Sequence, residues 1–65
     1  MKIDSFKIKL LLAEQGITQA VLAERCGISR QNVSAMLGRG SCSIATVGKL
    51  AKGLGVEIQE IIKEE

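Results

Sequence analysis

The residues with the most informative chemistry lie in one polar segment. Arg30 and Gln31 begin it, and Ser34 and Ala35 follow. Arginine can make two hydrogen bonds to the O6 and N7 atoms of guanine, and glutamine can make two to the N6 and N7 atoms of adenine. A serine hydroxyl can serve any base, and the alanine methyl suits the methyl group of thymine. The segment therefore carries side chains that could read base edges in duplex DNA.

Helical spacing decides which of these side chains would face outward. Val33, Met36 and Leu37 follow the spacing of an apolar helix face. At about 100° per residue, the opposite face carries no large apolar side chain. That face consists of Gln31, Ser34 and Ala35, flanked by Arg30 and Asn32. Each residue alone would fit a solvated helix surface, whereas the set favours base reading by Arg30, Gln31, Ser34 and Ala35.

A glycine separates this helix from the one predicted before it. In residues 18–37, TQAVLAERCGISRQNVSAML, Gly27 stands between two runs of helical periodicity. Because glycine inside a continuous helix costs about 1 kcal/mol relative to alanine, we expect one helix to end there and another to begin at the N-cap Ser29. Such a short connection makes the helices cross steeply, and Ala23 is small enough for close approach. The pair is predicted to be a helix-turn-helix, whose second helix can enter the DNA major groove.

The rest of the chain also reads as short helices separated by glycines, without proline. The predicted helices span about residues 6–15, 19–27, 30–37, 44–54 and 57–63. Their predicted N-caps are Asp4 or Ser5, Thr18, Ser29 and Ser43, and their stops are Gly16, Gly27, Gly38 with Gly40, and Gly55. Residues 1–3 are either disordered or a short extended segment. The expected fold class is all-α, a compact bundle of five short helices in a single domain of residues 1–65.

Each predicted helix has an apolar face for the core. The expected core residues are Ile8, Leu11, Leu22, Ala23, Cys26, Val33, Met36, Leu37, Ile44, Val47, Leu50, Ala51, Leu54, Ile58 and Ile61, with Leu12, on the apolar stripe of the first helix, and Ile62 left open.

The amino-acid composition predicts a soluble globular protein. Hydrophobic residues make up 46% and charged residues 25% of the 65 positions, which is typical of a globular protein. The longest apolar run, residues 10–13, is far shorter than the roughly 20 residues of a membrane span. No signal peptide is recognisable, so we expect a cytoplasmic location.

The two cysteines and the lack of histidine argue against catalysis and metal binding. Cys26 is expected to be a small core residue and Cys42 a loop thiol, unpaired in a reducing compartment. Their spacing matches no metal motif, and neither has a recognisable activating neighbour. We expect no cofactor, no metal and no enzymatic activity.

Charge is distributed unevenly along the chain. Residues 1–56 carry eight basic and three acidic side chains, a net charge of +5, whereas residues 57–65 have a net charge of −3. A basic body suits a polyanionic partner such as double-stranded DNA, although charge alone is equally consistent with an ordinary solvated surface.

Phosphate contacts are expected from residues around the base-reading segment. Gln19 lies in the first turn of its helix, where backbone N–H groups favour phosphate. Arg39 and Ser41 are expected in a mobile loop that leaves the second helix of the pair. Ser29 and Asn32 complete the predicted positioning set. Such contacts orient a protein on DNA without reading its sequence.

The chain resembles the Cro and phage-repressor, or lambda-repressor-like, family of helix-turn-helix regulators. The resemblance rests on Thr18-Gln19, Leu22-Ala23, Gly27-Ile28-Ser29, Val33-Ser34, Gly38-Arg39-Gly40, Leu50-Ala51-Lys52 and Leu54-Gly55-Val56. It implies a sequence-specific DNA-binding domain, commonly dimeric on a pseudo-palindromic operator. The leading hypothesis is a transcriptional regulator that binds operator DNA as a homodimer and either blocks or recruits polymerase, with repression favoured. It also supports Gln19 as a phosphate contact and Arg30, Gln31, Ser34 and Ala35 as groove-facing positions.

The chain departs from the family pattern at four positions. Cys42 stands where the family often has proline, and Leu12, Val21 and Leu37 stand where it often has polar side chains. We expect Leu37 in the core and leave Leu12 and Val21 open between core and contact surface. The alternative function is therefore an antitoxin-like or anti-regulator module that binds a protein partner through Leu12, Val21 or the acidic tail. Salt dependence separates the two, because DNA binding should weaken steeply with added salt, whereas an apolar contact should not.

Overall fold

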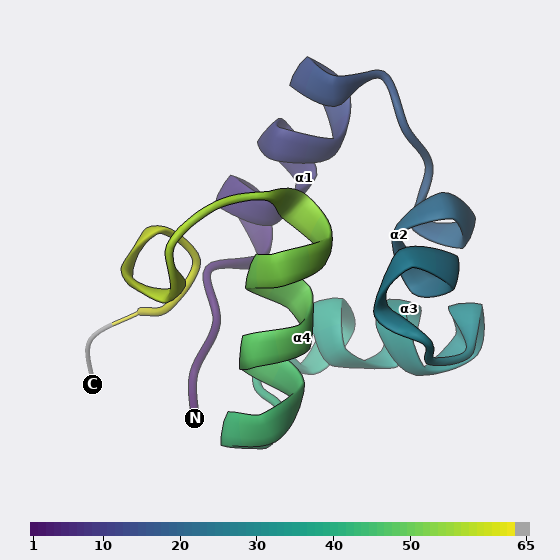
Figure 1. Cartoon of the computed structure of the whole chain (residues 1–65). Coiled ribbons are helices and arrows are strands. Elements are labelled where there is room, and N and C mark those ends of the chain that lie inside the picture. The colour runs from purple at the N-terminus through teal and green to yellow at the C-terminus, as the bar shows by residue number, and fades with distance from the viewer. Residues whose placement is uncertain (64–65) are drawn as a thin grey trace.

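Four α-helices and one 3-10 turn follow one another along residues 1–63, the part of the chain that the computed structural model describes. They are α1 (Ser5–Gln15), α2 (Gln19–Cys26), α3 (Arg30–Arg39), α4 (Ile44–Leu54) and η1 (Ile58–Glu60), shown in Figure 1. The predicted all-α fold class is confirmed. The α2–α3 pair is the predicted helix-turn-helix.

Each α-helix begins at a side-chain cap and ends before a glycine. The Asp4 carboxylate accepts a hydrogen bond from the Lys7 backbone N–H at 3.0 Å, so Asp4 and not Ser5 is the cap of α1. The predicted caps of the other helices, Thr18, Ser29 and Ser43, each accept from the N–H three residues on. These contacts satisfy N–H groups that have no partner within the helix, so the helix starts are fixed by short-range sequence.

Replacing Asp4 with alanine is expected to lower the free energy of unfolding by about 0.5–2 kcal/mol, because the Lys7 N–H loses its acceptor. Urea unfolding followed by circular dichroism measures this loss. Asp4→Asn keeps an acceptor and should unfold near the wild-type midpoint. Equal midpoints for Asp4→Ala and the wild type would show that the cap does not stabilise α1.

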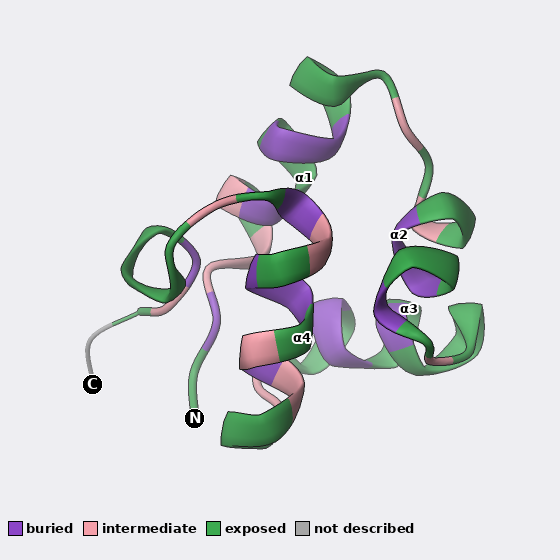
Figure 2. Ribbon diagram, viewed as in Figure 1, coloured by how far each residue is buried: buried purple, intermediate pink, exposed green. Residues whose placement is uncertain are grey.

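The core lies where the inner faces of the four helices meet (Figure 2). It contains Ile3, Ile8, Leu11, Leu12, Leu22, Ala23, Cys26, Val33, Met36, Leu37, Val47, Leu50, Ala51, Leu54 and Ile61. Leu12 is thereby resolved as a core residue and Leu37 is confirmed as one. Val21 instead remains 38% exposed.

The fifth predicted helix, residues 57–63, is shorter than expected. Only η1 forms. The prediction that Ile58 belongs to the core is wrong, because its side chain is 40% exposed, whereas Ile61 is fully buried as predicted and Ile62 is half-buried. A helix over residues 57–63 would need the Lys63 N–H for its last hydrogen bond, to the Gln59 carbonyl. That N–H instead donates to the Lys2 oxygen at 3.1 Å, and the Ile61 oxygen accepts from the Asp4 N–H at 2.8 Å.

Residues 1–3 are extended, which resolves the alternative that the sequence left open. Isolated antiparallel bridges pair Lys2 with Ser41 and Ile3 with Ile62. The Ile3 side chain is buried in the core. The amino-terminal segment thus lies between the loop after α3 and the chain after η1.

The prediction that Ile44 belongs to the core is wrong, because its side chain is 72% exposed. Ile44 is the first residue of α4, directly after the cap Ser43. It lies at the edge of the apolar face, and burial begins one turn later at Val47.

Candidate nucleic-acid interface

The turn between α2 and α3 consists of three residues, 27–29, and is built around Gly27. Gly27 adopts a left-handed conformation, with φ of 71°, which is strained for residues with a side chain. The Ile28 N–H donates back to the Ala23 oxygen at 3.0 Å, and Ser29 then caps α3. Ala23 is buried in the core that α2 shares with α3. This local geometry fixes how far α3 projects from the body.

The outward face of α3 has the residues that the helical spacing predicted. Val33, Met36 and Leu37 are buried. The residues on the other side are all exposed: Arg30, Gln31, Asn32, Ser34 and Ala35. Their side chains therefore form one solvent-facing surface on a rigid helix.

Three of the predicted positioning residues lie at the starts of α2 and α3. Gln19 is the first residue of α2 and is half-buried, while Ser29 and Asn32 are exposed at the start of α3. The Ser29 hydroxyl accepts a hydrogen bond from the Asn32 backbone N–H at 3.1 Å. A hydroxyl that accepts as a cap can still donate its proton, so the cap and a phosphate contact are compatible.

The expectation that Arg39 lies in a mobile loop is wrong. Arg39 is the last residue of α3, because Gly38 remains helical and the left-handed stop falls at Gly40. Ser41 follows the stop, is half-buried, and pairs with Lys2. Both residues are held by hydrogen-bonded structure at the carboxyl-terminal end of α3.

A hollow of about 270 Å³ separates α3 from the start of α4. Its lining consists of Ile28, Asn32, Met36, Arg39, Cys42, Ser43 and Thr46. Asn32 and Arg39 thus line the same hollow, together with the hydroxyl groups of Ser43 and Thr46 at the start of α4. Sequence reasoning missed Thr46, whose signal is its position three residues after a serine cap.

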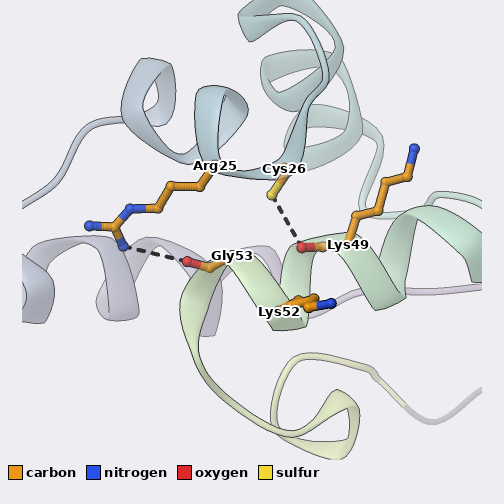
Figure 3. A pocket seen from close by; sticks show the side chains of 5 residues that line it. All are labelled: Arg25, Cys26, Lys49, Lys52 and Gly53. Atoms are coloured by element: carbon orange, nitrogen blue, oxygen red, sulfur yellow. Dashed lines mark hydrogen bonds between the residues drawn. The ribbon is translucent and has the colours of Figure 1, made fainter.

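A second pocket, of about 360 Å³, lies between α2 and α4 (Figure 3). Its lining residues are Arg25, Cys26, Lys49, Lys52 and Gly53. The Cys26 thiol donates to the Lys49 oxygen at 3.3 Å, and Arg25 Nη1 donates to the Gly53 oxygen at 3.4 Å. Arg25 and Lys52 occupy the last turns of their helices, where cations stabilise the negative end of the helix dipole.

Both cysteines are free thiols, and Cys26 is in the core as predicted. Burial raises the pKa of Cys26, with the Lys49 charge opposing the shift, and burial likewise raises the pKa of Cys42 against the amino-terminal and Arg39 charges. Each thiol is therefore protonated at neutral pH, and a thiol is a much weaker nucleophile than a thiolate.

Two other kinds of site do not occur within residues 1–63. No helix in that range is long and apolar enough to cross a membrane. Within the same range, no three His, Cys, Asp or Glu side chains gather closely enough to hold a metal ion.

Comparison with known proteins connects this geometry to a family. The sequence profile of the Cro/C1-type HTH DNA-binding domain matches residues 7–65. A comparison with curated proteins found no match. Among solved structures, the restriction-modification controller protein C.AhdI from Aeromonas hydrophila is 29% identical with a TM-score of 0.76, over 86% of each chain. The hypothetical transcription factor NHTF from Neisseria is 25% identical with a TM-score of 0.75, over 92% of this chain and 78% of that one.

Similar folds also occur inside longer proteins. A hydroxyethylphosphonate dioxygenase mutant is 26% identical with a TM-score of 0.82, and native PhpD with cadmium atoms is 25% identical with a TM-score of 0.81. The match includes 98% of this chain but spans only 14% of the length of each of those proteins. The likeness therefore concerns one small part of them.

Proposed function

Because this chain belongs to the Cro/C1-type helix-turn-helix family of DNA-binding domains, we propose that it is a transcriptional repressor that binds a pseudo-palindromic operator as a homodimer. The observation that carries the proposal is the surface of α3. Arg30, Gln31, Ser34 and Ala35 are exposed together, opposite a face buried in the core. Side chains of these types suit the donor and acceptor pattern of the major groove.

In this proposal, α3 lies in the major groove with its amino-terminal residues at the base edges. Arg30 reads guanine, Gln31 reads adenine, and Ser34 and Ala35 contact the neighbouring bases. Gln19, Ser29, Asn32, Arg39 and Ser41 contact phosphates and set the register. The net charge of +5 over residues 1–56 favours association with the polyanion.

Two relatives support a regulatory role, since one is described as a restriction-modification controller protein and the other as a hypothetical transcription factor. We infer that the chain acts by binding DNA in the cytoplasm, without cofactor and without catalysis. The dioxygenase likeness does not extend this inference to enzymatic activity, because it covers only 14% of those chains.

A second candidate function, binding of a protein partner, is favoured by apolar side chains on the surface. Phe6 on α1 is 71% exposed and Leu10, one turn later, is 44% exposed. Val21 is also exposed, whereas Leu12 is buried and is therefore not available to contact a partner. Of the acidic tail, Glu57 and Glu60 are exposed, and Glu64 and Glu65 lie outside the described residues.

Selection of random duplex DNA by the purified protein, followed by sequencing, tests the proposal. We expect enrichment of inverted half-sites about one helical turn, or roughly 10 base pairs, apart, and affinity that falls steeply as salt is raised. Enrichment of a single half-site would overturn the homodimer. No enrichment, with only weak salt-sensitive binding, would overturn the operator and favour the protein partner.

A further inference from the structure

The amino-terminal end of α1 is hydrogen-bonded to the carboxyl-terminal end of α3. The Ser5 hydroxyl donates to the Leu37 backbone oxygen at 2.7 Å, across 32 positions of sequence. Carbonyl groups in the last turn of a helix have no partner within the helix. Ser5 therefore supplies from outside a hydrogen bond that α3 cannot make for itself.

The same amino-terminal segment also holds the loop that follows α3. The Ile3 N–H donates to the Gly40 oxygen at 3.0 Å, and the Cys42 N–H donates to the Met1 oxygen at 3.0 Å. Between these two bonds, Lys2 and Ser41 form a bridge. Residues 37–42 are thus tied to residues 1–5 at successive points.

We propose that Ser5 is a positioning residue for DNA binding, which it serves by fixing the end of α3 from which Arg39 and Ser41 reach the phosphates. This inference rests on the proposed function. Helix ends fray, and a frayed last turn would have to be ordered at the moment of binding. Ser5 orders that turn already in the free protein. The conformational entropy of the turn is therefore lost during folding and not on DNA binding, so it does not weaken the complex.

A matched hydrogen bond at the other end of α1 provides the control. Gln15 Nε2 donates to the Leu54 oxygen, also at 2.7 Å, so it ties α1 to the end of α4. Gln15 additionally accepts from Arg25 Nη1 at 3.2 Å. Gln15→Ala therefore removes at least as much polar contact as Ser5→Ala, without touching α3.

The test compares Ser5→Ala, Ser5→Thr and Gln15→Ala on the DNA enriched by the wild-type protein. Affinities are corrected for the folded fraction of each variant. Ser5→Ala is expected to raise the Kd by about 3- to 10-fold, the range of one lost hydrogen bond. Its slope of log affinity against log salt should fall by about 1 if one phosphate contact is lost. Ser5→Thr keeps the hydroxyl and should restore both values, and Gln15→Ala should leave both unchanged.

Amide hydrogen exchange gives a second readout in the free protein. In Ser5→Ala, the N–H groups of residues 40–42 should exchange faster, while those at the end of α4 should not. Wild-type affinity for Ser5→Ala, or equal weakening by Ser5→Ala and Gln15→Ala, would overturn the positioning role and leave the operator intact. Failure of the wild type to enrich any DNA would overturn the proposed function, and this inference with it.

Discussion

Replacing Gly53 with valine is expected to destabilise the fold by about 1–3 kcal/mol, the usual cost of overpacking. A Cβ at this position would lie 2.7 Å from Cys26 Sγ, 3.4 Å from Leu22 Cδ1 and 3.6 Å from Arg25 Cβ. Glycine thus allows α4 to approach α2 closely. Since a chain of this length has a total stability of roughly 3–10 kcal/mol, the loss should shift the midpoint of urea unfolding by a measurable amount.

The matched control is Gly48, in the same helix. A Cβ there would meet nothing within 4 Å, so Gly48→Val should be neutral or slightly stabilising, by about 0.4 kcal/mol from helix propensity. Both variants are compared by urea unfolding.

A double-mutant cycle with Cys26→Ala identifies the clashing atom, because the cost of a side chain at position 53 should fall when the sulfur is absent. Equal effects of valine at positions 48 and 53, or no coupling with Cys26, would show that the close approach does not limit side-chain size.

The sequence predicts best what is decided within one or two turns of helix. Asp4, Thr18, Ser29 and Ser43 cap their helices through backbone groups three residues away, so neighbouring residues alone determine the outcome. The helical spacing of apolar residues likewise predicts the outward face of α3. Val33, Met36 and Leu37 occupy the buried side of the helix, so only the opposite side can face solvent. The candidate interface therefore follows from local rules once the turn at Gly27 is recognised.

The features that sequence reasoning missed depend on distant parts of the chain. The helix expected over residues 57–63 competes with pairing to residues 2–4, and nothing near Ile58 reveals that competitor. Apolar periodicity does not identify Gly53 as a packing residue, because glycine has no side chain. Its lack of a Cβ nevertheless permits the packing of α2 on α4. The sequence around Ser5 indicates only a capping role, whereas its hydroxyl donates to the Leu37 oxygen on another helix.

Single substitutions are expected to separate base-reading from phosphate-contacting residues. Loss of a base-reading side chain should change sequence preference, whereas loss of a phosphate contact should weaken binding to all sequences. Gln31→Ala should cost about 1–3 kcal/mol, or roughly 5- to 150-fold in affinity, and should relax preference at one base position. Arg30→Ala should do the same at a guanine. Arg39→Ala should weaken binding to all sequences alike and lower the salt slope by about 1.

Stability does not confound this comparison, because Arg30, Gln31 and Arg39 are exposed and surface substitutions usually change stability by less than about 0.5 kcal/mol. Gln59→Ala is the matched control, since Gln59 is exposed and belongs to η1, which lies apart from α3 (Figure 1). Each variant is used to select from a randomised DNA library at two salt concentrations. If Gln31→Ala retained the wild-type preference at every position, another surface would have to read the bases and the docking of α3 would be wrong. If Arg39→Ala changed the preference at one position only, Arg39 would be a base reader and the carboxyl-terminal end of α3 would enter the groove.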